Sequence, residues 1–290
     1  MVLAAGLGTR LRPLSDWAAK ALVPVGDRPA LAHVLDRITA PDVGPIVVNA
    51  HHRADDVRAF ARTCGRLIAV SEERELLGTA GGLTRAAPLL GPGEVLVWNA
   101  DIIANVDLRT LVASHASRDS EATLVIQPAP PAHGPVGVDE QGRVVRLRQE
   151  RFGDEVSGGE FLGISLLGAS LRERLPERGC LVGDGFLPAL RAGRTLRAFG
   201  HHAPWYDVGT VATYLAANLA WLDVRGLERW AGEGARVAPG VRLDRAVVGR
   251  GAQVVGSGPI TRCVLWPDAR ATAPLAGAVV TPHGVARAPG

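Results

Sequence analysis

Short apolar runs separated by amphipathic segments dominate the first two thirds of the chain. The apolar runs predict buried β-strands at residues 46–49, 67–70, 95–98, 122–126 and 161–167. Between these runs, apolar residues recur at helical spacing and predict helices over residues 30–38, 54–63, 79–90 and 108–117. Strands that alternate with helices are typical of an α/β fold with a Rossmann-like, doubly wound, mostly parallel sheet.

The pattern changes after a further predicted helix at residues 211–222. Over residues 235–281, small and β-branched residues alternate with Gly, Pro and Asp in steps of about six residues, as in a parallel β-helix. We therefore predict an α/β catalytic domain over residues 1–230 and a short, left-handed parallel β-helix over residues 231–290. The exposed last rung of a β-helix is an edge that a second copy could cover, so a homo-oligomer is one hypothesis.

Two further segments give weaker predictions. Residues 129–142 are rich in Pro and Gly and precede a hairpin strand at residues 144–147, so a substrate lid is one hypothesis for them. At the amino terminus, the residues before Gly6 are few for a strand of about five or six residues. A natural start a few residues upstream is therefore left open.

Composition excludes several classes of protein. The 32 basic and 29 acidic residues are scattered and give a net charge of +3, so no nucleic-acid partner is expected. Cys64, Cys180 and Cys263 are far apart and odd in number, which argues against a disulfide framework or a structural zinc site. Neither a membrane span nor a secretory leader is visible, so we expect no membrane association and a cytoplasmic location.

Lys20 is the single lysine among 32 basic residues. A high-GC codon bias that left one lysine by chance is one explanation. The other is functional, because a planar guanidinium cannot replace a compact ammonium that fits against a phosphate oxygen. Lys20 is therefore a candidate for phosphate chemistry.

A glycine loop follows the amino-terminal strand and contains Gly6, Gly8, Thr9 and Arg10. Glycines let backbone N–H groups approach phosphate oxygens, and Arg10 adds a bidentate cation. A glycine pair alone is weak evidence and also fits a simple turn. The string G-x-G-T-R-x-x-P, with Lys20 ten residues after Arg10, is more specific and predicts a phosphate-binding loop.

Two aspartates are candidate metal ligands. Asp101 ends an apolar strand, at the sheet edge where open α/β folds bind ligands. Asp207 precedes a turn in which Thr210 is expected to cap the next helix. Either residue alone reads more simply as a turn or capping aspartate. Together they suit Mg²⁺, which prefers carboxylate, phosphate and water oxygens.

With these motifs in place, the sequence resembles the sugar-nucleotide pyrophosphorylase family of nucleotidyltransferases, and most of all its mannose-1-phosphate guanylyltransferase branch. The likeness extends over nearly the whole chain, through SEERELLGTAGGL, VLVWNADII, FLGISLL and WYDVGTVATYLAAN. Ala19 and Ala21 depart from it, because relatives have proline beside the signature lysine, and this puts the rigidity of the loop in question. The resemblance implies that a nucleoside triphosphate and a sugar 1-phosphate react, with Mg²⁺, to give a nucleoside-diphosphate sugar and pyrophosphate.

The resemblance also implies residue roles. The catalytic residues are expected to be Arg10, Lys20, Asp101 and Asp207. The nucleotide is expected to contact Leu3, Ala4, Gly6, Gly8, Thr9, Arg10, Glu75, Gly78 and Thr79. Glu75 either reads the base or braces the loop, and an exposed loop acid is the alternative. The sugar phosphate is expected at Asn99, Arg148, Glu160 and Gly163; Arg148, with Glu150 and Arg151, lies where relatives carry a Glu-Lys pair.

Several alternatives stay open at this point. GTP with mannose 1-phosphate is favoured, but a uridylyl or thymidylyl transferase for another sugar and a non-catalytic regulatory paralogue are both compatible with the motifs. A dehydrogenase is disfavoured because the loop reads G-x-G-T-R instead of G-x-G-x-x-G. The pairs His51-His52 and His201-His202 are expected to be structural, since adjacent strand residues face opposite sides.

Overall fold

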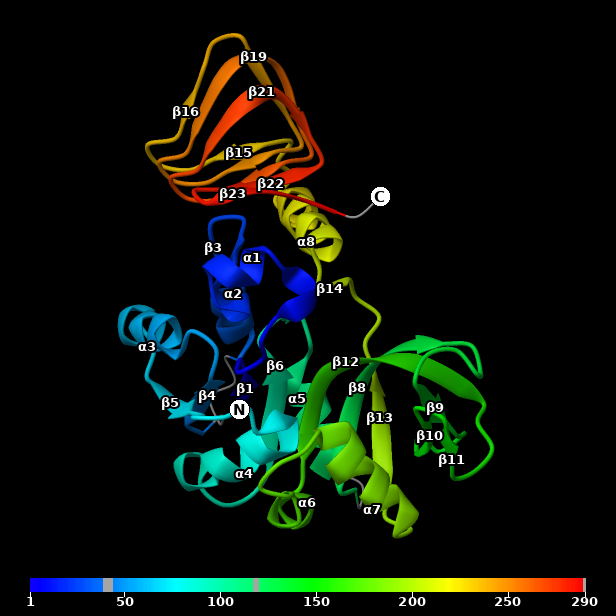
Figure 1. Cartoon of the computed structure of the whole chain (residues 1–290). Helices are drawn as coiled ribbons and strands as arrows, with labels where there is room; N and C mark the ends of the chain where they lie inside the picture. The colour runs from blue at the N-terminus through cyan, green and yellow to red at the C-terminus, as the bar shows by residue number, and fades with distance from the viewer. Residues whose placement is uncertain (39–43, 117–119, 289–290) are drawn as a thin grey trace. The chain divides into compact units, whose positions relative to one another are not determined.

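The computed structural model describes residues 1–38, 44–116 and 120–288. By its internal contacts the chain forms two compact units (Figure 1). The first unit consists of Met1–Gly6 and Val34–Trp205, and the second of Leu7–His33 and Tyr206–Gly290. The chain therefore leaves the first unit inside the glycine loop and returns to it within a helix. The predicted domains over residues 1–230 and 231–290 divide the chain on another basis and stay a prediction.

A large mixed sheet forms the centre of the first unit (Figure 1). Its strands are in the order β5-β4-β1-β6-β12-β8-β13. Among the described residues of this path, β12 is the only strand antiparallel to the other six. The predicted mostly parallel α/β sheet is therefore confirmed. The bounds are β1 Val2–Leu3, β4 Ile46–Ala50, β5 Ile68–Glu72, β6 Val95–Asn99, β8 Ala122–Ala129, β12 Ser157–Leu167 and β13 Leu196–Gly200. An antiparallel extension on β12 consists of β9 Val136–Val138, β10 Val144–Leu147 and β11 Glu150–Arg151.

Alternating residues on the strands face the helices on either side of this sheet. Leu124 and Ile126 of β8 belong to a buried apolar cluster that includes Leu83 of α4. Thr123, which precedes Leu124 and points to the opposite face of the sheet, lies against α5, where its hydroxyl is 2.8 Å from Nδ1 of His115. The helices are α3 Ala54–Thr63, α4 Gly78–Leu90, α5 Leu108–Ala116, α6 Ala169–Glu173, a π-helical turn Leu181–Phe186, and α7 Leu187–Arg191. None of the helices described is long and apolar enough to cross a membrane.

Two strand predictions need correction at their first residues. Leu67 lies before β5 and is 95% exposed, so the apolar run began one residue too early. β12 starts at Ser157, four residues before the predicted 161, because Gly158 and Gly159 are buried strand residues without an apolar side chain. A hydrophobic pattern cannot register such glycines.

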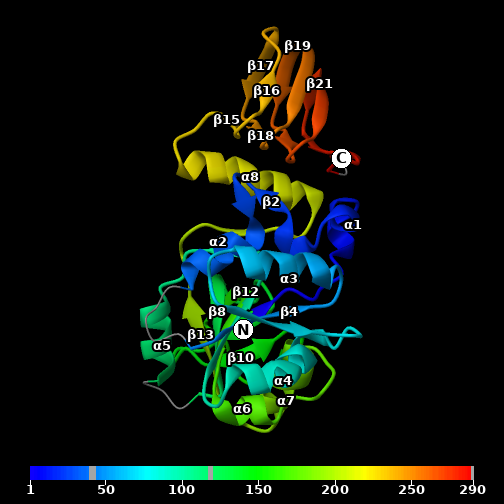
Figure 2. The same ribbon diagram turned by 90° about the vertical axis from the view of Figure 1, so that its left-hand side faces the viewer.

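The second unit combines the segment after the glycine loop with the carboxyl-terminal third of the chain. Its early part holds α1 Leu14–Trp17, β2 Pro24–Val25, β3 Arg28–Pro29 and the start of α2 Ala30–Arg37. Its later part begins with β14 Trp205–Asp207, whose first residue belongs to the first unit, and α8 Val211–Val224. Figure 2 shows α8 lying between β2 and the carboxyl-terminal strands.

The carboxyl-terminal strands stack in parallel with a regular step. Trp230 pairs with Val247 and Val247 with Val264, while Arg236 pairs with Gln253 and Gln253 with Arg270. The buried residues of these strands are mainly Val, Leu and Ala, and an antiparallel hairpin ends the stack. The strands are β15 Trp230–Ala231, β16 Arg236–Val237, β17 Val241–Asp244, β18 Val247–Val248, β19 Gln253–Thr261, β20 Val264–Leu265, β21 Arg270–Ala276, β22 Ala278–Thr281 and β23 Gly284–Arg287.

Candidate functional site

The carboxyl ends of three parallel strands bring polar side chains to one edge of the sheet. Leu3 of β1 is in register with Asn49 of β4 on one side and Asn99 of β6 on the other. The N–H of Ala4 donates to Oδ1 of Asn49 at 2.7 Å, and the N–H of Ala100 donates to the carbonyl of Leu3 at 3.0 Å. These bonds fix the start of the glycine loop at the edge where α/β sheets bind ligands.

A buried carboxylate, Glu73, connects this edge to the start of α4. Glu73 is 3% exposed, and its Oε1 accepts from Nδ2 of Asn49 at 2.6 Å. Its Oε2 accepts from the N–H of Leu77 at 3.0 Å, directly before α4. A Cβ on Gly82 would lie 2.8 Å from Oε1, so only glycine fits beside the carboxylate. Asn49 and Glu73 therefore hold the glycine loop and the GTAGG segment in one arrangement.

The sequence prediction selected Glu75 in this loop and missed Glu73. Glu75 is exposed and forms an ion pair with Arg178 at 2.5 Å, and the hydrogen bond from Arg178 lowers the pKa of the Glu75 carboxyl. This contact corresponds to the bracing role among the alternatives considered. Position along the chain could not single out Glu73, because both acids precede the predicted helix and Glu75 lies closer to its start.

In the segment GTAGG, residues 78–82, Gly78 and Gly81 are required by the close approach of residues 177–181. A Cβ on Gly78, which has a φ of 76°, would lie 2.3 Å from the carbonyl oxygen of Gly179. The same carbonyl accepts from the N–H of Ala80 at 2.9 Å. The hydroxyl of Thr79 accepts from the N–H of Leu181 at 2.6 Å. Gly78 and Thr79 thus lie beside the segment that begins the π-helical turn.

Arg148 and Cys180 meet at the same place. Nη2 of Arg148 lies 3.5 Å from Sγ of Cys180, and Arg148 itself has a left-handed φ of 57°. Desolvation works to raise the pKa of the Cys180 thiol, but hydrogen bonds from the backbone N–H groups of Gly183 and Val182, with the charge of Arg148, leave it lowered. The structure therefore brings Arg148, Thr79 and an exposed cysteine together.

Alkylation should distinguish Cys180, whose pKa is lowered, from Cys263, whose pKa is raised. We expect iodoacetamide to modify Cys180 first, because the thiolate is the nucleophile. Its alkylation rate should rise at a pH below the pKa of a free thiol, which is about 8.5. Cys263 should react last, since desolvation raises its pKa. Peptide mass spectrometry measures the alkylation rates of Cys180 and Cys263 from about pH 6 to about pH 9, a range that spans the usual titration of thiols. In Arg148→Gln the Cys180 profile should move to higher pH, and an unchanged profile would contradict the assignment.

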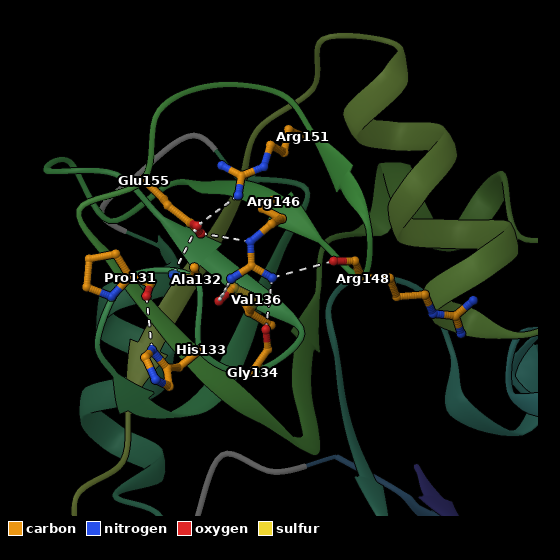
Figure 3. A network of polar contacts seen from close by, with 9 residues as sticks. All are labelled: Pro131, Ala132, His133, Gly134, Val136, Arg146, Arg148, Arg151 and Glu155. Carbon is orange, nitrogen blue, oxygen red and sulfur yellow. Dashed lines mark hydrogen bonds and ion pairs between the residues drawn. The ribbon is translucent and has the colours of Figure 1, made fainter.

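A buried ion pair anchors the segment proposed as a lid (Figure 3). Nε of Arg146 lies 2.9 Å from Oε2 of Glu155, and its Nη1 donates to the carbonyl of Gly134 at 2.8 Å. Oε1 of Glu155 accepts from the N–H of Ala132 at 3.1 Å. A Cβ on Gly134 would lie 2.3 Å from the carbonyl of Gly159, so the segment touches β12. The lid itself stays a prediction.

The predicted sugar side lies on β6 and β12. Gly163, with a φ of 71°, packs so closely that a Cβ there would be 2.3 Å from Nδ2 of Asn99. Glu160 is exposed three residues earlier on the same strand, and Asp101 follows Asn99 by two residues. Asn99, Asp101 and Gly163 are therefore neighbours in the first unit, together with Leu3.

The glycine loop, the predicted phosphate-binding loop, continues in the second unit, where it packs on the segment that carries Lys20. Gly8 has a φ of 63°, and a Cβ there would lie 2.9 Å from Cβ of Ser15 and 3.2 Å from Cβ of Lys20. Oγ of Ser15 donates to the carbonyl of Gly8 at 2.8 Å. Thr9 and Arg10 are exposed in the short 3₁₀ turn that follows. Ala19 and Ala21, which replace the prolines of relatives, are both buried.

Asp207 also belongs to the second unit. It ends β14, and a Cβ on Gly209 would lie 2.5 Å from its Oδ2, so glycine is needed beside the carboxylate. The predicted cap at Thr210 is confirmed, because its Oγ1 accepts from the N–H of Thr213 at 3.1 Å and starts α8. The four predicted catalytic residues are thus divided, with Asp101 in the first unit and Arg10, Lys20 and Asp207 in the second.

One histidine of each adjacent pair, His51 and His201, lies in a structural position. Nδ1 of His51 is 2.9 Å from the carbonyl oxygen of Glu73, and His201 is buried. Within the described part of the chain, no three His, Cys, Asp or Glu side chains are grouped as a metal site would require. A cation at Asp101 or Asp207 would therefore take most of its ligands from phosphate and water.

Glu73→Gln should disturb both the fold and nucleotide binding. Its amide would present a donor to either Asn49 or the N–H of Leu77, and a buried group left without a partner costs about 1–3 kcal/mol. We expect a lower free energy of unfolding in urea and a higher KM for the nucleotide. The exposed Glu75→Gln is the matched control and should change stability by less than about 0.5 kcal/mol. Equal behaviour of the two variants would contradict the assignment.

Comparison with known proteins gives consistent results. The family model described as nucleotidyl transferase matches residues 1–224. Mannose-1-phosphate guanylyltransferase from Mycobacterium tuberculosis is 31% identical over 281 residues, which cover 90% of this chain and 77% of that protein. A probable mannose-1-phosphate guanylyltransferase 1 from Oryza sativa is 27% identical over 92% of this chain and 74% of its own. In fold, the chain is similar to HddC from Yersinia pseudotuberculosis complexed with GMP-PN, with a TM-score of 0.63 and 23% identity. The match covers 76% of this chain and 97% of the HddC chain.

Proposed function

This chain belongs to the nucleotidyl transferase family, as its motifs predicted, and we propose that it joins GTP to mannose 1-phosphate or a closely related sugar 1-phosphate. Members of the family make nucleoside-diphosphate sugars from a nucleoside triphosphate and a sugar 1-phosphate. The observation that carries the proposal is the sheet edge at Leu3, where Asn49 and Asn99 flank the strand that leads directly into the glycine loop. The preference for guanine and mannose rests on the named relatives.

The proposed reaction is a single in-line displacement. An oxygen of the sugar phosphate attacks the α-phosphorus of GTP and forms a new P–O bond. The bond from the α-phosphorus to the bridging oxygen breaks, and pyrophosphate leaves with the electron pair. The nucleophile is already an anion, so the step needs no general base. Lys20 and Arg10 would stabilise the charge that builds on the transferring and leaving groups.

The remaining roles follow the two sides of the site. The backbone of Leu3, Ala4 and Gly6 is proposed to face the base, and Gly8, Thr9, Gly78 and Thr79 the rest of the nucleotide. Asn99, Glu160 and Gly163 are proposed to contact the sugar and its phosphate. Arg148, which lies near Thr79, is proposed to bind the phosphate of the sugar 1-phosphate. Glu75 is proposed to brace its loop through Arg178.

Asp101 and Asp207 are proposed to hold Mg²⁺. Their chemistry fits the ion, because both are carboxylates, and glycine beside Asp207 leaves room at its oxygens. When bound, Mg²⁺ supplies positive charge that neutralises the triphosphate and the developing pyrophosphate. The chain's own contribution would be the carboxylates of Asp101 and Asp207 and the cations Lys20 and Arg10.

The carboxyl-terminal strands are proposed to form a short, left-handed parallel β-helix. Parallel pairing at equal steps, as between Trp230, Val247 and Val264, supports a coil that repeats once per rung. A second copy covering the last rung, and a cytoplasmic location, are further parts of the proposal.

Pyrophosphate release measures this function directly. The panel pairs GTP, UTP, dTTP and ATP with mannose, glucose and N-acetylglucosamine 1-phosphates. We expect the highest kcat/KM for GTP with mannose 1-phosphate. A preference for UTP or dTTP would overturn the guanylyl assignment. No release from any pair, with a nucleotide sugar still bound in calorimetry, would favour the non-catalytic paralogue.

A further inference from the structure

The segment that carries Lys20 groups with the carboxyl-terminal strands in the second unit. Lys20 opens a 3₁₀ turn, Lys20–Leu22, and the chain continues into the hairpin of β2 and β3. The N–H of Ala30 donates to the carbonyl of Val23 at 3.0 Å and closes the hairpin at its base. The backbone position of Lys20 therefore depends on what holds this hairpin.

A directed chain of hydrogen bonds leads from the carboxyl-terminal strands to the hairpin. The indole Nε1 of Trp266 donates to the hydroxyl of Tyr214 at 2.9 Å. The same hydroxyl donates to the carbonyl of Pro24 at 2.5 Å. An indole N–H can only donate and a carbonyl can only accept, so the hydroxyl of Tyr214 has one possible orientation. Tyr214 is fully buried, and desolvation raises its pKa, which keeps the proton on the hydroxyl.

The turn of the hairpin is held by the same helix, α8. Oδ1 of Asn218 accepts from the N–H of Gly26 at 2.8 Å, and Nδ2 of Asn218 donates to the carbonyl of Tyr214 at 3.0 Å. Gly26 has a φ of 61°, and a Cβ there would lie 2.0 Å from the ring of Trp221. Side chains from α8, which lies beside β2 in Figure 2, thus fix the hairpin at Pro24 and at Gly26.

A second contact reaches the other side of Lys20. The rings of Trp17 in α1 and His283 in the last hairpin have centroids 5.7 Å apart. A Cβ on Gly284 would lie 3.4 Å from the Trp17 ring. The carboxyl-terminal strands therefore contact the chain both before and after Lys20, and α8, which mediates one of these contacts, begins four residues after Asp207.

We propose that Tyr214 and Trp266 are positioning residues that set Lys20 for catalysis. Through them the carboxyl-terminal strands act on the reaction without contributing a group that touches substrate. The inference rests on the proposed role of Lys20. A displacement of about 1 Å in a catalytic group can cost about 10²-fold in rate, so loss of the Tyr214 hydroxyl bond to Pro24 should appear in kcat.

Two conservative variants test the proposal. Tyr214→Phe removes the hydroxyl, and Trp266→Phe removes the N–H donor while leaving an aromatic ring. We expect each to lower kcat about tenfold, less than the 10²-fold of a 1 Å displacement, while KM for GTP changes by less than about twofold. Because the two residues act as one unit, the double variant should lose little more than the worse single variant.

Val254→Ala is the matched control. Val254 is buried in β19 and belongs to the same strands, but it makes no hydrogen bond in the chain from Trp266 to Pro24. It should lower Tm and leave the kcat of the folded protein unchanged. If Tyr214→Phe fails to fold, the comparison of kcat between Trp266→Phe and Val254→Ala tests the positioning role instead.

The outcomes separate the inference from the proposed function. Equal kcat for Trp266→Phe and Val254→Ala, at matched folded fractions, would overturn the positioning role. Additive losses in the double variant would do the same. If Lys20→Ala keeps normal turnover, the proposed function of Lys20 fails whatever Tyr214 does. If Lys20→Ala is inactive and Tyr214→Phe is normal, only the inference fails.

Discussion

Replacing Lys20 by alanine should remove most turnover and leave the fold intact. The loss of one charged group that stabilises a transition state costs about 10²–10³-fold in kcat. Lys20 is only partly buried, and its Cβ, which alanine retains, is the atom that approaches Gly8. The expected result is therefore a large fall in pyrophosphate release with a Tm close to that of the wild type.

Lys20→Arg and Arg12→Ala sharpen this test. A guanidinium keeps the charge but not the compact shape, so Lys20→Arg should recover little of the lost rate. Arg12 lies in the glycine loop, before α1, where it is exposed and pairs with Asp16, so its removal should leave kcat unchanged. Full activity of Lys20→Arg would reduce the role of Lys20 to that of a general cation.

Asp101→Asn should make the reaction depend on far more Mg²⁺. Loss of even an outer-shell partner of a metal ligand costs about 10–100-fold in metal affinity, so we expect at least a tenfold rise in the half-saturating Mg²⁺ concentration. Rates measured over a Mg²⁺ titration at saturating GTP give this value. Part of the lost kcat should return at high Mg²⁺.

Asp107→Asn is the control for this charge change. Asp107 caps α5, where its Oδ1 accepts from the N–H of Thr110 at 3.1 Å, and asparagine caps equally well. Its Mg²⁺ dependence should match that of the wild type. An identical titration for Asp101→Asn would remove Asp101 from the proposed metal site, and Asp207→Asn would then be the remaining test of it.

Local patterns were sufficient for several elements of this fold. The predicted helix over residues 54–63 is α3, the predicted strand over 144–147 is β10, and Thr210 caps α8 as expected. These features depend on neighbours within a few residues, which the sequence displays directly. Motifs of the same local kind, the glycine loop with Lys20 and the GTAGG segment, were sufficient to identify the family.

Partners distant in sequence could not be read in this way. The sequence analysis chose Glu75 and missed Glu73, because the role of Glu73 depends on hydrogen bonds with Asn49 and Leu77 that form only in the folded chain. The contact of Trp266 with Tyr214 joins residues 52 apart, and that of Tyr214 with Pro24 joins residues 190 apart.

The sequence by itself therefore determined the α/β class, the positions of most strands of the large sheet and of the longer helices, and the family, whereas the residues expected to bind phosphate stay a prediction. Only the tertiary structure decided which buried polar groups hold those residues and that the lysine segment groups with the carboxyl-terminal strands. The physical reason is that periodicity reports how far each position is buried, whereas a hydrogen bond between distant segments depends on the three-dimensional path that brings them together.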